Sequence, residues 1–376
     1  MAHCKREGHH QDEDPLAKRS KVSDSSVESD EEKINLGSHI SVNDHPTLAE
    51  TNAHKGSNDE QVDSRDHKEN QMHNVNLSPE DKALCNSEVL KPQVGKLFCI
   101  EADAAEDKGS RHAMEDAWVV LPDASLEFPG KLRCAHFAIY DGHGGRLAAE
   151  FAQKNLHPNV LSAGLPRELM DIKAAKRAIL EGFQRTDESL LQESTKGNWQ
   201  DGATAVCLWI LGQTVLVANI GDAKAVLARS SDGCQISSEA GSTLKAILLT
   251  REHKAIYPQE RARIQKAGGT VGANGRLQGR LEVSRAFGDR HFKKVGVIAT
   301  PDIHSFELTE KEQFIILGCD GLWGVFGPSD AVNFVQKQLK EKSSATTAAR
   351  RLVREAVRER RCKDNCTAIV IVFRHN

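Results

Sequence analysis

The stretch Phe137–Gly145, FAIYDGHGG, places an aspartate, a histidine and three glycines directly after an apolar run. A run such as FAIY is typical of a buried strand, whereas Asp and Gly are frequent in turns. One such stretch is compatible with an ordinary turn and equally with a site built at the end of a strand. The choice depends on whether other acidic residues occupy comparable positions elsewhere in the chain.

The bulk composition narrows the classes of partner. The chain has 376 residues and a formal net charge of −3, which argues against nucleic acid or an anionic membrane as the main partner because both require a basic face. Nine dispersed cysteines without a C-x-x-C pair favour a reducing compartment over a disulfide scaffold. The sequence has neither an apolar run of membrane-spanning length nor a secretory signal. We therefore expect an intracellular protein of the nucleus, the cytoplasm or both.

The first 92 residues differ in composition from the remainder. No Phe, Trp or Tyr occurs before Phe98, and polar and charged residues dominate. Such a segment buries too little apolar surface to offset its ordering entropy, so we expect a disordered tail over residues 1–92 and one folded unit over 93–376. Lys5-Arg6 and the basic cluster at residues 18–21 are compatible with a two-part nuclear import signal or with a solvated charge run.

Apolar runs of strand length recur after Phe98 and are bounded by Gly, Asp, Pro or Asn. Since many of them are apolar almost throughout, we expect sheets that are covered on both faces. Residues 204–228 look like a three-strand antiparallel meander whose first turn is Gly212-Gln213. The predicted strands are 117–121, 134–140, 204–211, 214–220, 224–228, 246–250, 314–319 and 368–373.

Helical patterns are fewer and longer. The segment 258–269 begins at Pro258 and ends with Gly268 and Gly269, the proline-first, glycine-last asymmetry that is typical of helices. Strands in consecutive runs with helices grouped between them indicate an α+β fold, most simply sheets sandwiched by helices. The predicted helices are 145–156, 168–192, 258–269, 329–340 and 345–360.

Acidic residues stand repeatedly where a predicted strand begins or ends. Any single carboxylate in such a place is more often a turn or cap residue than a ligand. If the strand ends converge, however, the like charges cannot all stay ionised unless a cation neutralises them. Oxygen ligands without paired Cys or His select hard cations such as Mg2+ or Mn2+. The residues concerned are Glu115, Asp116, Asp141, Asp222, Asp320 and Asp364.

Seven segments resemble, in type, order and spacing, the motif series of the protein phosphatase 2C family, the metal-dependent Ser/Thr phosphatases. The resemblance extends from about residue 97 to the C-terminus. It implies a four-layer α/β/β/α sandwich, in which helices flank a central antiparallel β-sandwich with the metal ions at one end of the sheets. The segments are SRHAMEDAWVV, FAIYDGHGG, DGATAVCLWI, VANIGDAKAVL, RLEVSRAFGD, FIILGCDGLWGV and CKDNCTAIVIVF.

The resemblance also implies a ligand set for two Mg2+ or Mn2+ ions. Asp141 would bridge both ions, and the Gly142 carbonyl and Glu115 would bind one of them. Asp320 and Asp364 would complete the other. Asp222 resembles the position associated with a weaker third ion.

Three further residues carry roles that the resemblance implies. Asp116 would hold metal-bound waters, Arg111 matches the phosphate-binding arginine, and His143 matches the proposed general acid. The expected reaction is hydrolysis of phosphoserine and phosphothreonine by a hydroxide that bridges the two ions. The alternative is a catalytically silent pseudophosphatase, a binding module of the same fold.

The resemblance leaves the pathway open but restricts the partners. We expect phosphorylated protein substrates, no nucleic acid, no membrane and a monomer. A flap-like segment over about 255–295 contains no Trp, unlike members that serve as hormone co-receptors, so that role is not expected. Trp118 stands where many members have His, and Glu252 and Ala255 replace frequent Asp and Pro. None of these three is an expected metal ligand.

Overall fold

The computed structural model describes residues 98–123, 134–165, 171–230 and 244–375, all of which belong to one unit, Ser87–Asn376. The predicted tail over residues 1–92, with its basic clusters, lies outside the described residues. The described residues belong to the unit that was expected to carry the phosphatase motifs.

The described strands form two antiparallel sheets. In the first sheet the order is β1 (Phe98–Asp107), β11 (Cys366–His375), β10 (Glu312–Gly318), β6 (Lys224–Ser230) and β7 (Leu244–Leu248). In the second it is β2 (Ala117–Leu121), β3 (Cys134–His143), β4 (Gly202–Leu211), β5 (Thr214–Ile220) and β9 (Asp302–Glu307). The short strand β8 (Phe287–Gly288) pairs with the first residues of β4.

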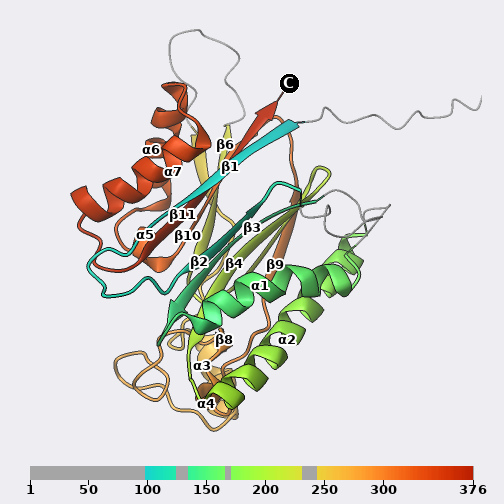
Figure 1. Cartoon of the computed structure of the whole chain (residues 1–376), viewed down its shortest axis with the longest axis vertical. Helices are drawn as coiled ribbons and strands as arrows, with labels where there is room; N and C mark the ends of the chain where they lie inside the picture. Colours follow the sequence, from blue (N-terminus) through green and yellow to red (C-terminus); the bar gives the residue numbers. More distant parts are fainter. Residues whose placement is uncertain (1–97, 124–133, 166–170, 231–243, 376) are drawn as a thin grey trace, which may run out of the picture. The chain divides into compact units, whose positions relative to one another are not determined.

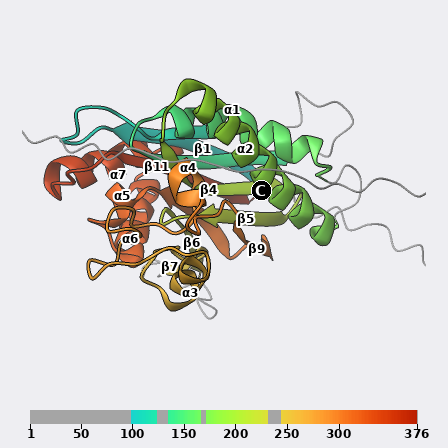
Figure 2. The same cartoon turned by 90° about the horizontal axis from the view of Figure 1, so that it is seen from below.

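Helices cover the outer face of each sheet. Helices α1 (Leu147–Ser162) and α2 (Ile172–Gly197) lie on the second sheet, and α6 (Pro328–Lys340) and α7 (Ala345–Arg354) lie on the first (Figures 1 and 2). A π-helical turn, Glu355–Glu359, ends α7. The short helices α3 (Pro258–Lys266), α4 (Arg290–Lys293) and α5 (Asp320–Trp323) lie in the connections. This arrangement confirms the predicted α+β class and its α/β/β/α layer order.

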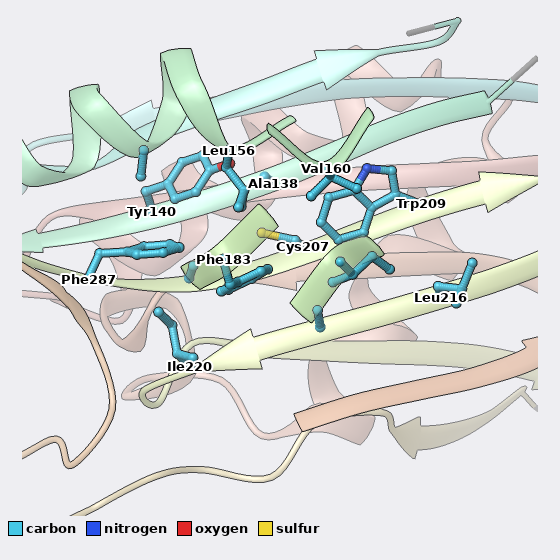
Figure 3. Close-up of a cluster of buried hydrophobic side chains, with 14 of the residues drawn as sticks. Ala138, Tyr140, Leu156, Val160, Phe183, Cys207, Trp209, Leu216, Ile220 and Phe287 are labelled. Atoms are coloured by element: carbon cyan, nitrogen blue, oxygen red, sulfur yellow. The ribbon is translucent and has the colours of Figure 1, made fainter. Parts of the chain in front are cut away.

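Strand alternation builds the core in separate layers. In β3, Phe137 and Ile139 belong to the cluster between the two sheets, whereas Ala138 and Tyr140 belong to the cluster beneath α1 and α2. Neighbouring side chains on a strand point to opposite faces, and here both faces are buried. Figure 3 shows the helix-side cluster, in which Tyr140 lies close to side chains of α1, α2 and β4. The runs that are apolar throughout are explained by this double coverage.

One predicted connection is wrong. Strands β4 and β5 form the predicted hairpin, and Gly212 in its turn has a φ of 60°. The third strand does not continue the meander, because β6 pairs with β10 and β7 in the other sheet. The chain changes sheets at Gly221, whose φ of 88° is a conformation that glycine adopts without strain.

Three strands were not predicted. Strand β1 contains Glu101, Asp103 and Glu106 among its ten residues, so it lacks the apolar run that marked the others. Strand β9 is polar and lies at an edge of its sheet, and β8 has only two residues. The other eight strands and all five predicted helices overlap observed elements. The first residues of the predicted helix 168–192 lie outside the described residues.

Candidate active site

The DGHGG stretch, residues 141–145, spans the end of β3. The sequence predicted that Asp141 follows the strand. In the structure it belongs to the strand, because β3 continues through His143 and pairs Asp141 with Thr204 of β4. A Cβ atom on Gly142 would collide with the carbonyl oxygen of Glu115. Glycine at this position therefore lets β3 lie directly against the segment that carries Glu115.

Three predicted metal ligands lie close together at the end of β3. Asp141, Asp222 and Asp320 each offer a carboxylate oxygen, and these oxygens all lie within 4.8 Å of one another. They come from β3, from the connection between β5 and β6, and from the first residue of α5. Asp116 and Asp141 form a second group of the same span with the thiol of Cys319. The expected convergence of distant acidic residues is thus observed for four of them.

Asp364 and Glu115 lie in the same cavity as these residues, but neither belongs to one of the two groups whose ligand atoms lie within 4.8 Å of one another. The cavity has a volume of about 360 Å³ and is lined by both residues together with Asp141, Asp222 and Asp320. A carboxylate oxygen of Asp364 lies 2.6 Å from a guanidinium nitrogen of Arg111. The predicted phosphate-binding arginine is therefore paired with a predicted metal ligand.

Asn365, which sequence reasoning missed, joins two segments of the site. Its side-chain amide donates to the carbonyls of Lys108 (3.0 Å) and Ala113 (2.9 Å). Its Oδ1 accepts from the backbone N–H of Glu115 at 2.8 Å. Three hydrogen bonds of the amide are directed at the loop that carries Arg111, so Asn365 fixes that loop against the start of β11. Its place beside Asp364 in the CKDNC segment was the available signal.

Burial and mutual repulsion make the carboxylates difficult to ionise. Burial raises the pKa of Asp116 to about 6, and burial, together with the charges of Asp222 and Asp364, raises that of Asp320 to about 7. The pKa of Asp141 is raised well above its ordinary value by burial and by the carboxylates of Asp116 and Asp320. Groups in this state gain stability when a cation neutralises them.

The donor set fits a hard divalent cation. Asp116 accepts a hydrogen bond from the Thr367 hydroxyl at 2.6 Å through Oδ2, while its buried Oδ1 has no hydrogen-bond partner among the described residues. Cys319 is the one sulfur beside the carboxylates in these groups. Its thiol accepts from the Thr367 N–H at 3.1 Å and contacts the Asn365 carbonyl, and burial raises its pKa. The available ligands are therefore oxygen atoms, which Mg2+ and Mn2+ prefer.

His143 is paired with a second residue that sequence reasoning missed. Its Nε2 lies 2.7 Å from Oδ2 of Asp289, which is only 4% exposed. Burial lowers the pKa of the imidazole, but the charge and hydrogen bond of Asp289 outweigh it, so the net shift of the His143 pKa is upward. Asp289 is the last residue of the segment RLEVSRAFGD, and this position was the signal that could have indicated it.

A lysine supplies positive charge beside Asp222. The Lys254 ammonium lies 3.4 Å from Asp222 and 2.7 Å from Glu282. Burial raises the pKa of Asp222, and Lys254 offsets part of this shift. The Lys254 ammonium therefore neutralises part of the negative charge around Asp222.

Comparison with known proteins decides the family. Residues 100–366 match the family model described as Protein phosphatase 2C. The chain belongs to the protein phosphatase 2C family. As a member it is a metal-dependent protein-serine/threonine phosphatase, and the acidic groups above are residues that could hold its metal.

Plant and animal phosphatases of the family are similar to this chain. "Probable protein phosphatase 2C 67" of Oryza sativa subsp. japonica is 66% identical over the whole length of both chains. "Probable protein phosphatase 2C 8" of Arabidopsis thaliana is 77% identical over 74% of this chain and 80% of its own length. The human "Integrin-linked kinase-associated serine/threonine phosphatase 2C" is 38% identical over 74% of each chain.

Solved structures support the fold. A serine-threonine phosphatase 2C from Toxoplasma gondii superposes with a TM-score of 0.63 at 23% identity, over 73% of this chain and 95% of the other. Within the described residues, each helix is too short or too polar to cross a bilayer.

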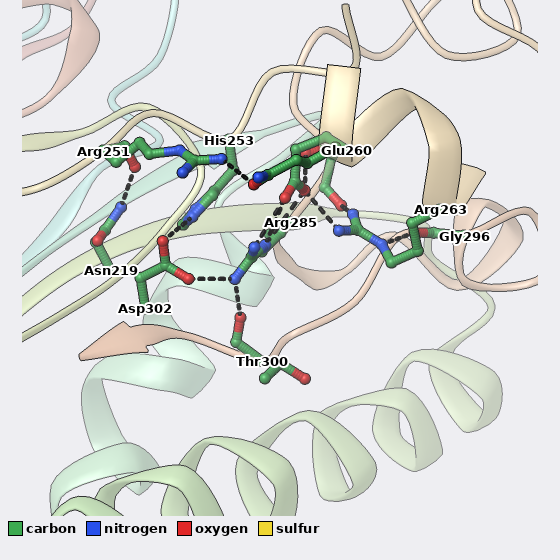
Figure 4. Close-up of polar contacts among 11 residues, drawn as sticks. Asn219, Arg251, His253, Glu260, Arg263, Arg285, Gly296, Thr300 and Asp302 are labelled. Atoms are coloured by element: carbon green, nitrogen blue, oxygen red, sulfur yellow. Dashed lines mark hydrogen bonds and ion pairs between the residues drawn. The ribbon is translucent and has the colours of Figure 1, made fainter. Parts of the chain in front are cut away.

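In this phosphatase 2C chain a buried ion-pair network anchors the flap-like segment. Glu260 of α3 is 2% exposed and pairs with Arg263 (2.7 Å) and Arg285 (2.8 Å). Arg285 also reaches Asp302 of β9 at 2.8 Å, and the buried His253 lies 3.1 Å from the same carboxylate (Figure 4). Residues 255–297 also have a small apolar cluster of their own. The segment that borders the cavity at Arg276–Val283 is therefore fixed to the second sheet at its base.

Proposed function

We propose that this phosphatase hydrolyses phosphoserine and phosphothreonine in proteins at a site for two divalent cations, Mg2+ or Mn2+. The observation that carries the proposal is the approach of Asp141, Asp222 and Asp320 to within 4.8 Å of one another in one cavity. Three carboxylates at this separation repel one another unless cations lie between them. The upward shifts in the pKa of Asp116, Asp141 and Asp320 support the same conclusion.

The proposed ligands come from both sheets. Glu115, Asp141, the Gly142 carbonyl, Asp320 and Asp364 would hold the two ions. When bound, the ions would activate a water molecule as the nucleophile near neutral pH by lowering its pKa. All five residues line the cavity described above, which supports the assignment.

Two further acidic residues have supporting roles in the proposal. The unpartnered Oδ1 of Asp116 accepts hydrogen bonds from water within the site. Asp222, which lies close to Asp320, contributes to a weaker third cation position, where it also contacts Lys254.

Arg111 orients the phosphoryl group. Its side chain is 59% exposed and holds Asp364 at 2.6 Å. A guanidinium is a planar, permanently charged fork that suits two phosphate oxygens. When a phosphorylated residue enters the cavity, Arg111 exchanges its contact with Asp364 for the substrate oxygens, which leaves Asp364 available as a ligand.

His143 donates a proton to the departing serine or threonine oxygen. Asp289 accepts a hydrogen bond from Nε2, so the proton available for transfer is on Nδ1. Asp289 favours the protonated imidazole, which is the form that a general acid requires. The net upward shift in the His143 pKa favours the protonated form relative to an ordinary imidazole.

The proposal is tested by metal depletion. We expect EDTA to abolish hydrolysis of p-nitrophenyl phosphate and of a phosphothreonine peptide, and Mn2+ or Mg2+ to restore both. The two substrates are measured with the same protein preparation. EDTA that has been saturated with Mg2+, at the same ionic strength, is the control for non-specific effects of the chelator. Hydrolysis that continues at full rate in excess EDTA would contradict the metal-dependent mechanism. A protein inactive with every metal would favour the pseudophosphatase alternative.

We further propose that the chain acts as a monomer in the nucleus, the cytoplasm or both, with residues 1–92 as a polar tail and 93–376 as the catalytic domain. The support is compositional: the basic residues Lys5-Arg6 and the cluster at 18–21 suit an import signal. Replacing both clusters with alanine in a fluorescent fusion should reduce nuclear signal. An unchanged distribution would leave the clusters as a solvated charge run.

A further inference from the structure

A second cavity adjoins the candidate active site. It has a volume of about 370 Å³ and shares Arg111, Asp320 and Asp364 with the metal-binding cavity. Its remaining wall is formed partly by Arg361 and Lys363, which flank Cys362 in the loop before β11. A residue that neighbours a phosphoserine or phosphothreonine in the first cavity can therefore place its side chain in the second.

Arg361 and Lys363 carry positive charge that the protein itself does not use. Both residues are exposed, and within the described part of the chain neither side chain has a hydrogen bond or ion pair. Arg360, the preceding residue, is different: its guanidinium donates to the Val325 carbonyl at 3.1 Å, pairs with Asp330 and lies 3.6 Å from the centre of the Phe326 ring. One arginine of this loop stabilises the fold, and the next one faces the cavity without a partner.

The loop that presents the two cations is held in place. Arg361 has a φ of 60°, a left-handed conformation that costs a non-glycine residue free energy and persists where the surroundings impose it. The Lys363 carbonyl accepts a hydrogen bond from the Ser110 hydroxyl at 2.7 Å, and Asn365 clamps the end of the loop. Cations on a fixed backbone lose less entropy on binding a ligand than cations on a free one.

We propose that this second cavity binds an anionic side chain of the substrate, a carboxylate or a second phosphoryl group next to the residue that is dephosphorylated. Arg361 and Lys363 supply the attraction, and charge-assisted hydrogen bonds to such anions are stronger than neutral ones. The inference rests on the proposed function, because Asp320 and Asp364 at the boundary repel an anion until cations neutralise them. The phosphatase therefore prefers acidic phosphopeptides over neutral or basic ones.

The test compares peptides that differ only in the charge that flanks phosphothreonine. One peptide carries Glu at the two positions on each side, the second carries Gln at all four, and a third replaces one Glu with a non-hydrolysable phosphonate analogue of phosphoserine. We expect kcat/KM for the Glu peptide to exceed that for the Gln peptide about tenfold at low salt, and to fall toward it as ionic strength rises. A larger gain for the third peptide identifies a phosphoryl group as the preferred anion.

The variant Arg361→Ala/Lys363→Ala provides the decisive comparison. The ratio of kcat/KM between the Glu and Gln peptides, taken within each protein, should fall from about tenfold to below twofold in this variant. The matched control is Arg358→Ala, which removes one exposed arginine outside the cavity and should keep the ratio. Equal ratios in the wild type and the double variant would overturn the inference.

A binding measurement separates this inference from the proposed function. Fluorescence anisotropy reads affinity for the metal-loaded protein without turnover when the Glu and Gln peptides carry a non-hydrolysable phosphonate analogue in place of phosphothreonine. Preference for the Glu peptide without hydrolysis would contradict the proposed function and retain the anionic subsite. Hydrolysis of both peptides without preference, in rate and in affinity, would retain the function and contradict the subsite.

Discussion

The two ends of β3 bury polar side chains in opposite ways. Near its start, His136 is fully buried and stacks against the rings of His157 and Trp209, with centroids 4.5 Å from each. Near its end, Asp141 meets Asp116 and Asp320. The histidine is accommodated by ring contacts and by a 3.2 Å contact of its Nδ1 with the Leu208 carbonyl. The carboxylates have mainly one another as neighbours, so like charges converge at the acidic end. They do not converge at the histidine end, where the buried Nε2 of His136 has no hydrogen-bond partner among the described residues.

This difference also appears in the direction of the pKa shifts. Burial, and then the charge of His157, lower the pKa of His136 well below 6.5, so the ring stays neutral at physiological pH. Burial raises the pKa of Asp141 well above 3.8. Both shifts oppose charge, but only the acidic end keeps several oxygens within 4.8 Å of one another, where a cation can take the place of protons. Burial of a polar group therefore indicates function where several groups of like charge converge.

The largest expected effect comes from changing the acidic end. Asp141→Asn should lower phosphatase activity by at least about 10⁴-fold, because the residue proposed to hold both ions loses its charge. The fold should remain, and the metal-free variant should unfold at the same or a higher temperature than the wild type, since one repelling carboxylate is removed. Aryl phosphate turnover and a thermal melt in EDTA measure both.

Two related variants complete this comparison. Asp364→Asn should behave like Asp141→Asn, whereas Asp171→Asn, an exposed carboxylate at the start of α2, should keep full activity. Near-normal turnover by Asp141→Asn or Asp364→Asn would remove these residues from the metal site.

A smaller effect is expected at the histidine of the same end. His143→Ala should slow a phosphothreonine peptide by about 10²- to 10⁴-fold, the usual contribution of a general acid. It should slow p-nitrophenyl phosphate much less, because that leaving group needs no proton. Asp289→Asn should move the basic limb of the pH–rate profile, where activity falls as His143 loses its proton, to lower pH. The reason is that Asp289 raises the pKa of His143. Equal slowing of both substrates by His143→Ala would assign His143 to a structural role.

The smallest effect belongs to the opposite end of β3. The pKa of His136 is lower in the folded state than in the unfolded state, where it is near 6.5. At pH values between these two pKa values, the unfolded chain therefore binds more protons than the folded chain. The stability contribution of the neutral ring is complete above pH 6.5 and is lost as pH falls below it, by about 1.4 kcal/mol per pH unit.

Urea unfolding at pH 6.5 and 5.5 measures this slope. In His136→Phe the fall in the free energy of unfolding should be smaller by about 1 kcal/mol, while activity at pH 7.5 should change less than about twofold. His291→Gln, at an exposed histidine, is the control and should keep the wild-type slope. A steep slope in His136→Phe would show that other groups dominate the acid sensitivity.

Much of the fold followed from apolar runs, and the exceptions have physical causes. Strand β6 reads like the third strand of a meander, but its partner β10 is about ninety residues away in sequence, and no local pattern encodes such a choice. Strand β1 was missed because Glu101 and Asp103 interrupt its apolar residues.

The site was predictable where residue type alone limits the chemistry. Asp141 and Asp320 were found because acidic residues at strand ends suit a cation, and they lie together in the structure. Asn365 and Asp289 were missed because their importance lies in their partners: Asn365 acts on a loop 250 residues earlier, and Asp289 on His143, 146 residues earlier. Pairings between residues so far apart in the sequence can be recognised only in the three-dimensional structure.

Anomalous diffraction from crystals grown with Mn2+ tests the central claim most directly. If the acidic end of the sandwich is a two-metal site, two peaks should appear in the cavity, each about 2.0–2.6 Å from a ligand oxygen, with Asp141 in contact with both. Crystals in which Mn2+ is absent from this cavity, or lies away from Asp141, would contradict the claim.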